Sequence, residues 1–191
     1  MKMIAHTIMF GMIALMTGQP AAAVASVEVE GVTFKRDVIY RGESLELQGY
    51  GLLRYMVFIK AYVGAFYLPP SVASADVLEP VAKRLELQYF HAISKEDFDQ
   101  STRAKIADNT TPFQFEQLQS RMDQLGAIYQ DVQPGDRYSL TFVPGQGTEL
   151  ALNGKPLGTI PGQDFARAVF GVWLGANPID DDFRDLLLGV R

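Results

Sequence analysis

The sequence predicts an α+β fold in which a large antiparallel sheet packs against helices. Segments with strand patterns come in two runs, and each run is followed by a pair of segments with helix patterns. Such grouping, without strict alternation, is typical of α+β proteins. Lys83–Phe90 alternates apolar and polar residues along its length, and Asn153-Gly154 is a strong turn signal between two short strand-like segments. Both features favour antiparallel pairing.

The first run of strands is centred on Gly49–Pro70, the longest apolar and aromatic stretch after residue 25. Its Val, Ile, Tyr and Phe residues suit strands, and Pro69-Pro70 cannot continue a ladder. We expect two strands here, joined by a tight connection near Arg54–Val57. The segments before them are expected as a strand at Val27–Phe34, bulged at Gly31, and a strand at Ser44–Gln48.

The second strand of this stretch has two different faces, because side chains alternate along a strand. One face is apolar and is expected to lie in the core: Ile59, Ala61, Val63, Ala65 and Tyr67. The other face is aromatic but also carries a cation and a phenol: Phe58, Lys60, Tyr62, Gly64 and Phe66. This mixed face is suited to lining a cleft. The same alternation also fits a solvated outer face, or a face partly covered by a helix.

The rest of the chain predicts two pairs of helices around a second run of strands. Acidic residues after Ser94 favour a helix N-terminus, and Pro112 after Thr111 marks the start of a second helix. The expected strands that follow are Arg137–Val143, Thr148–Leu152 and Lys155–Ile160. The other expected helices are a short one around Ala73–Leu78, one at Asp164–Leu174 ending at Gly175, and a short one after Asp180–Asp182.

The N-terminal segment predicts an exported protein. Lys2, the apolar run Ile4–Met16 and the A-x-A site at Ala23–Ala25 are typical of a secretory signal peptide. The run is shorter than the roughly 20 apolar residues that a membrane span needs. We expect residues 1–25 to be this signal and 26–191 to be a single bacterial domain, periplasmic or secreted. The protein would contact the membrane through this signal peptide before cleavage. The alternative is that the N-terminal segment is not cleaved and anchors the protein to the membrane.

Composition and motifs argue against several functional classes. The net charge is −5, and no cluster of Lys or Arg follows residue 25, which argues against a nucleic-acid binder. The chain has no Cys and no G-x-S-x-G motif, and its second His, His91, stands alone. Metal sites need clustered ligands, and Asp180–Asp182 is better explained as the acidic first turn of a helix. We therefore expect no cofactor and no metal.

Three segments in the chain resemble the bacterial branch of the chalcone isomerase-like family. They are GYGLLRYMVFIKAYVGAFYLPP, YSLTFVPGQGTELALNGKPLGTIPG and DFARAVFGVWLGANPIDDDFRDLLLG, and the resemblance spans roughly Val29–Gly189. It implies an open-faced β-sandwich, in which a large antiparallel sheet carries a layer of helices on one face. In the plant enzymes of this family, a cleft between sheet and helices cyclises chalcones to flavanones.

The resemblance also implies where a site would lie. The enzymes use an Arg, a Thr, a Tyr, an Asn and a further Thr or Ser. Arg54 resembles the arginine, although G-x-G-x-x-R is one residue longer than the usual G-x-G-x-R. At the other four positions, in order, stand Tyr62, Phe98, Lys105 and Val172. Only the arginine is the same residue type as in the enzymes, so the resemblance favours ligand binding over chalcone isomerisation.

Some non-catalytic relatives bind fatty acids in the same cleft through an arginine, and we expect this chain to bind a small hydrophobic carboxylate. The expected ligand-binding residues are Arg54, Lys60, Tyr62, Phe66, Phe98, Lys105 and Val172. Each buried CH₂ would contribute about 0.8 kcal/mol and an Arg–carboxylate contact about 1.5–3 kcal/mol, so the tail would dominate affinity and Arg54 would orient the ligand.

Two alternatives stay open. One is a structural or interaction role in the cell envelope, in which Arg54 forms an internal salt bridge. The other is an isomerase, an intramolecular lyase, acting on a chalcone-like or unknown small substrate.

Overall fold

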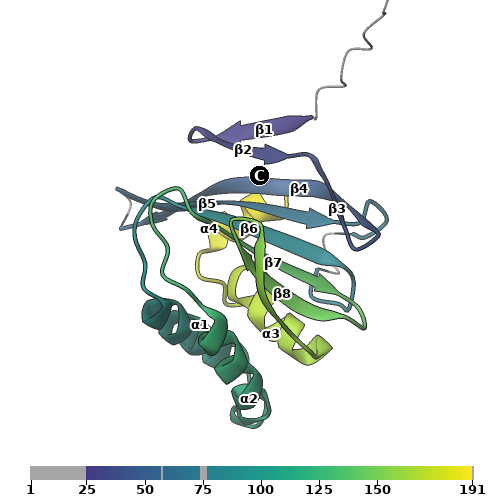
Figure 1. The fold of residues 1–191 in the computed structure, drawn as a ribbon, viewed down its shortest axis with the longest axis vertical. Helices are drawn as coiled ribbons and strands as arrows, with labels where there is room; N and C mark the ends of the chain where they lie inside the picture. The colour runs from purple at the N-terminus through teal and green to yellow at the C-terminus, as the bar shows by residue number, and fades with distance from the viewer. Residues whose placement is uncertain (1–24, 57, 74–76, 191) are drawn as a thin grey trace, which may run out of the picture.

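The computed structural model describes residues 25–56, 58–73 and 77–190, so the predicted signal peptide lies almost wholly outside it. The described residues form a seven-stranded sheet, a two-stranded sheet and four helices. The helices lie on one side of the large sheet and the small sheet lies on the other (Figure 1). This arrangement confirms the predicted α+β fold and the open-faced sandwich.

The large sheet follows the order of the chain, and all its neighbouring strands are antiparallel. Its strands are β3 (Asp37–Tyr40), β4 (Glu43–Tyr55), β5 (Ile59–Leu68), β6 (Lys83–Tyr89), β7 (Arg137–Val143), β8 (Gly147–Leu152) and β9 (Lys155–Ile160). Strand β4 joins the expected strand at Ser44–Gln48 to the first half of the Gly49–Pro70 stretch. Asn153 and Gly154 both have positive φ, at 51° and 79°, as the tight turn between β8 and β9 requires.

The single strand expected at Val27–Phe34 is wrong. The segment forms a hairpin of β1 (Ser26–Val29) and β2 (Val32–Lys35), paired in register from Val29–Val32 outward. Glu30 and Gly31 are both in the left-handed region, at φ 51° and 78°. Gly31 therefore marks a two-residue turn, where the sequence had suggested a bulge.

The helices are α1 (Lys95–Asn109), α2 (Pro112–Ile128), α3 (Gln163–Leu174) and α4 (Asp181–Leu187). Three of the four described helices begin after capping residues, and α3 begins after Gly162 without a side-chain cap. The side chains of Ser94, Thr111 and Asp180 each accept a hydrogen bond from a first-turn backbone N–H, which stabilises the start of their helices. The short helix expected around Ala73–Leu78 falls partly on residues 74–76, which are not described, and Val77 and Leu78 lie in a turn. Within the described residues, no helix is long and apolar enough to cross a membrane.

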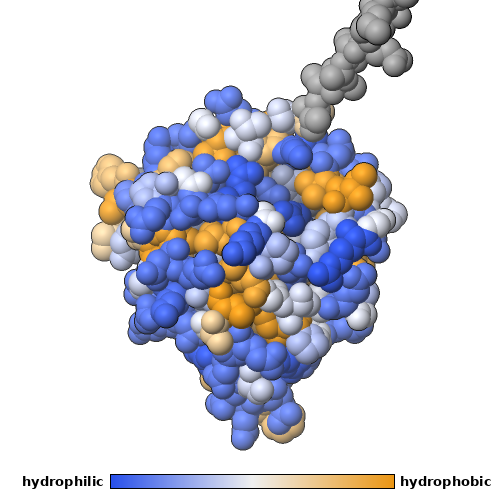
Figure 2. All heavy atoms as spheres, viewed as in Figure 1, coloured by the Kyte–Doolittle hydropathy of each residue, from blue (hydrophilic) through white to orange (hydrophobic). Residues whose placement is uncertain are grey.

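Both faces of the large sheet are covered, so the protein has two apolar clusters. On the helix side, Tyr62, Phe66 and Leu87 belong to the larger cluster with residues of the helices. On the hairpin side, Val63 and Tyr67 belong to a smaller cluster with β1 and β2 residues. The mixed face of β5 is therefore inside the protein from Tyr62 onward. The outer surface in Figure 2 is mostly hydrophilic, with apolar residues in small patches.

Helix α4 packs directly on the backbone of β4 and β5 because glycines leave room for it. A Cβ at Gly49 would overlap the carbonyl oxygen of Leu186 and come within 2.6 Å of that of Leu187. A Cβ at Gly51 would stand 2.6 Å from the Leu186 side chain. Since backbone atoms cannot move aside as a side-chain tip can, Gly49 is the most constrained of these positions.

We predict that Gly49→Ala destabilises the protein by about 3 kcal/mol, the upper end of the usual range for overpacking. Gly171→Ala is the matched control, because a Cβ there meets no atom within 4 Å. In the interior of α3, this change should stabilise the protein by roughly 0.5–1 kcal/mol. Urea unfolding followed by circular dichroism measures both effects. Equal stability of the two variants would contradict the proposed packing of α4.

Candidate functional site

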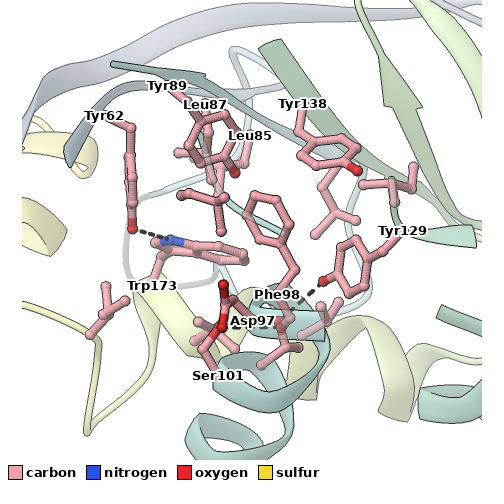
Figure 3. A pocket seen from close by; sticks show the side chains of 17 residues that line it. Tyr62, Leu85, Leu87, Tyr89, Asp97, Phe98, Ser101, Tyr129, Tyr138 and Trp173 are labelled. Carbon is pink, nitrogen blue, oxygen red and sulfur yellow. Dashed lines mark hydrogen bonds between the residues drawn. The ribbon is translucent and has the colours of Figure 1, made fainter. Parts of the chain in front are cut away.

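A cavity of about 240 Å³ lies between the helix-covered face of the large sheet and helices α1 and α3 (Figure 3). The sheet contributes Tyr62, Leu85, Leu87, Tyr89, Tyr138, Leu140 and Leu150. The helices and their ends contribute Phe98, Thr102, Tyr129, Val169, Val172 and Trp173, beside Ile93. Asp97, Ser101 and Ile179 also line it and are exposed, so they form its rim.

Aromatic contacts hold the walls of this cavity together. The ring of Phe98 stacks on Tyr129 with centroids 5.5 Å apart, and it meets Tyr89 and Tyr138 edge-on at 5.3 Å each. Tyr62 and Tyr89 are direct partners across β5 and β6, and their rings are 5.5 Å apart. Offset and edge-on pairs of this kind add to the stabilisation from buried area and fix the orientation of the rings.

Most polar groups in the cavity are paired with one another. The indole N–H of Trp173 donates to the Tyr62 hydroxyl at 3.0 Å, and the hydroxyls of Thr102 and Tyr129 are 3.1 Å apart (Figure 3). The Tyr138 hydroxyl accepts from the backbone N–H of Gln130 at 2.8 Å and donates to its carbonyl at 2.7 Å. The Tyr89 hydroxyl has no hydrogen-bond partner among the described residues.

The cavity is electrically almost neutral. Among the described residues, no Lys, Arg or His lines it, and Asp97 at the rim is its one acidic side chain. Burial raises the pKa values of the Tyr62, Tyr89 and Tyr129 phenols well above their ordinary value of 10.0. These phenols therefore stay protonated near neutral pH and act as hydrogen-bonding groups. The described residues also hold no group of three or more His, Cys, Asp or Glu placed to bind a metal ion.

The structure brings three of the seven expected site residues together and places the other four elsewhere. Tyr62, Phe98 and Val172 line the cavity. Phe66 lies on the same face of β5 but is fully buried in the core and does not line the cavity. Lys105 forms an ion pair with Asp108 in its own helix at 3.1 Å and does not line it either.

Arg54 and Lys60 lie on the opposite face of the sheet. Both contact the carboxylate of Glu30 in the β1–β2 turn, Arg54 at 3.7 Å and Lys60 at 2.6 Å, and their side chains are 47% and 48% exposed. The expectation that Arg54 lies at the polar end of the cleft is therefore corrected: it forms a salt bridge, as one of the alternatives had it. Exposed ion pairs of this kind contribute about 0–1 kcal/mol.

A β-bulge explains why the alternation of side chains misleads at this point. The register passes from Leu53–Tyr62 to Arg54–Lys60, so Ala61 is an extra residue on β5. Leu53 and Tyr62 face the helices, while Arg54 and Lys60 face the hairpin. The bulge accounts for the face of Lys60. Arg54 follows the ordinary alternation of β4, in which Gly51 and Leu53 face the helices, so the additional residue in G-x-G-x-x-R puts the arginine on the other face. Phe58, also expected on the cleft face, is 89% exposed at the tip of the β4–β5 hairpin.

Four aromatic residues of the cavity are missing from the set expected from the sequence: Tyr89, Tyr129, Tyr138 and Trp173. The sequence could have predicted Tyr89, because alternation along β6 places it on the same face as Leu85 and Leu87. Tyr129 follows the last residue of α2, and Trp173 lies in the apolar α3. Their approach to the sheet depends on how the helices dock, which local patterns do not specify.

A family model described as chalcone isomerase-like matches residues 26–189. The chain belongs to the chalcone isomerase-like family. No curated protein matches it. Among solved structures, the crystal structure of a fatty-acid binding protein of Arabidopsis thaliana is similar, with a TM-score of 0.68 and 16% identity over 87% of this chain and 97% of that chain. At this identity, the likeness shows that the two share the chalcone isomerase-like fold.

For this chalcone isomerase-like chain, we predict a loss of stability above pH 10. The buried phenols have raised pKa values in the folded state, so the unfolded state loses protons first as the pH rises. Their contribution is fully present below pH 10 and then falls by about 1.4 kcal/mol per pH unit for each phenol. Tyrosinate absorbance and circular dichroism should therefore change together. Full ionisation of all tyrosines in a protein that keeps its fold would contradict this.

Proposed function

We propose that this protein is exported and that it binds a small hydrophobic molecule, such as a short fatty acid, in the aromatic cavity without transforming it. The observation that carries the proposal is the cavity itself, which is walled by apolar and aromatic side chains between the sheet and the helices. Concave sites lined mainly by such residues, with a few polar groups, are the usual form of small-molecule sites. The shared fold with a plant fatty-acid binding protein supports the same reading.

The size of the cavity limits the ligand. A volume of about 240 Å³ corresponds to roughly eight groups the size of a water molecule, at about 30 Å³ each. An apolar chain of about eight carbons, or one aromatic ring with a short substituent, would fill it. At about 0.8 kcal/mol per buried CH₂, such a chain gains roughly 6 kcal/mol before the cost of association is subtracted. Longer chains would have to extend past the rim.

The side chains at the cavity favour binding over catalysis. Cyclisation of a chalcone requires a phenolate nucleophile and a group that stabilises an enolate. Phe98 and Val172 stand at two of the positions that carry hydroxyl groups in the enzymes, and their side chains can donate no hydrogen bond. A general base works best with a pKa near the operating pH, whereas burial moves the pKa of Tyr62 further from it.

The ion pair of Arg54 does not weaken the proposal. The Arg54–Glu30 ion pair fits a structural role for the Arg54 side chain, because it joins the β1–β2 hairpin to the large sheet. The cavity at Tyr62 is on the other face of the sheet, so binding there does not need Arg54. An apolar ligand would be held by the walls of the cavity and by the hydroxyl groups within it.

We predict that octanoic acid or an alcohol of the same length quenches or shifts the fluorescence of Trp173, the one tryptophan of the chain. Val172→Phe should weaken binding by about tenfold or more, because the larger side chain fills the space the ligand needs. Arg54→Ala is the control and should bind as the unchanged protein does.

Gentle purification followed by native mass spectrometry and solvent extraction tests for a ligand already bound. If no lipid co-purifies and no added ligand is taken up, the proposal fails.

A further inference from the structure

We propose that the cavity selects ligands whose polar end is uncharged, and that the Tyr89 hydroxyl binds this end. The ligand class is thus a short apolar chain or ring that ends in an alcohol, aldehyde or ketone oxygen. The inference rests on the proposed binding function and specifies its ligand. It also changes the expectation drawn from the sequence, in which an arginine would hold a carboxylate.

The distribution of charge excludes a strong site for an anion inside the cavity. A carboxylate buried there would meet no cation among the described lining residues. Arg54 and Lys60, near the β4–β5 turn, form ion pairs with Glu30 on the other face of the sheet. Asp97 at the rim adds a negative charge. Burying an ion without a partner is far more costly than burying a neutral oxygen that accepts hydrogen bonds.

Tyr89 is the group best placed to hold a neutral oxygen. Its side chain is almost fully buried, at 3% exposure, and its hydroxyl has no hydrogen-bond partner among the described residues. In Figure 3 it points toward the space enclosed by the other aromatic rings. Buried hydroxyls are nearly always paired in proteins, so an unpaired one that faces a cavity indicates a place for a ligand atom. The Tyr138 hydroxyl, by contrast, is fully used by Gln130.

Tyr62 supplies a second hydroxyl group that lines the cavity. The Tyr62 oxygen accepts a hydrogen bond from Trp173, which leaves the proton of the hydroxyl free to be donated. Tyr62 and Tyr89 are direct partners across β5 and β6, so their hydroxyls leave the sheet on the same side. Because the bond from Trp173 orients the Tyr62 hydroxyl, a ligand at this position also changes the surroundings of the indole.

The experiment compares octanol with octanoate, which have chains of the same length, by titration of Trp173 fluorescence at pH 7.5. We expect octanol to bind at least tenfold more tightly. Tyr89→Phe should weaken octanol binding about three- to tenfold and leave the binding of octane unchanged or slightly improved. This variant keeps the ring that Phe98 contacts and removes a hydroxyl that has no partner in the part of the chain that the structure describes, so it should fold normally.

The control variant is Tyr55→Phe, which removes a hydroxyl from a tyrosine that is 58% exposed and does not line the cavity. It should bind octanol as the unchanged protein does. If octanoate binds more tightly than octanol, or if Tyr89→Phe has no effect on octanol, the inference is overturned while the proposed binding function stands. If no probe changes the fluorescence and none is retained in native mass spectrometry, both fail together.

Discussion

From Tyr62 onward, successive side chains of β5 are buried on opposite faces of the large sheet. Tyr62 and Phe66 pack under the helices, while Val63 and Tyr67 pack under the β1–β2 hairpin. A strand buried on both faces must have a covering layer on each side, which is why this chain needs both a helical layer and a separate hairpin. The residues of β5 that face the helices are Tyr62, Gly64, Phe66 and Leu68, and Gly64 pairs with Gly51 of β4. The glycines admit α4 to the backbone, and the aromatic ring of Tyr62 forms part of the cavity wall beside it.

The bulge at Ala61 divides charged from neutral surroundings along the same strand. Before it, Lys60 and its neighbour Arg54 face the hairpin and meet Glu30, whose pKa is lowered by the hydrogen bond from Lys60. After it, the helix-facing positions carry no charge. One additional residue between Gly51 and Arg54 is therefore enough to remove a cation from the cavity without altering the fold around it. The electrostatic character of the site depends on this register more than on composition.

Local patterns were sufficient to predict most elements, because caps and alternation act over a few residues. Ser94, Thr111 and Asp180 begin helices as expected, and the β8–β9 hairpin forms at Asn153-Gly154. The side of the sheet that Lys60 faces could not be predicted in this way, since it depends on the bulge at Ala61, whereas Arg54 lies opposite its neighbour Leu53 by the ordinary alternation of β4. Tyr62, Phe98 and Val172, inferred by resemblance, do line the cavity, whereas Lys105 forms an ion pair with Asp108. Tyr129 and Trp173 join them only through helix docking.

The walls of the cavity are mostly apolar and aromatic. The polar groups inside its rim are hydroxyls and one indole N–H. Such groups have no net charge, and burial keeps the phenols protonated by raising their pKa values. A neutral hydroxyl can both donate and accept a hydrogen bond, so it distinguishes ligands by the presence and position of an oxygen atom more than by charge. An arginine would instead distinguish them by charge and by the planar geometry of a carboxylate. Because Arg54 lies on the hairpin side of the sheet beside Glu30, the recognition we propose falls to the tyrosines, and among them to Tyr89, whose hydroxyl the described residues leave unpaired.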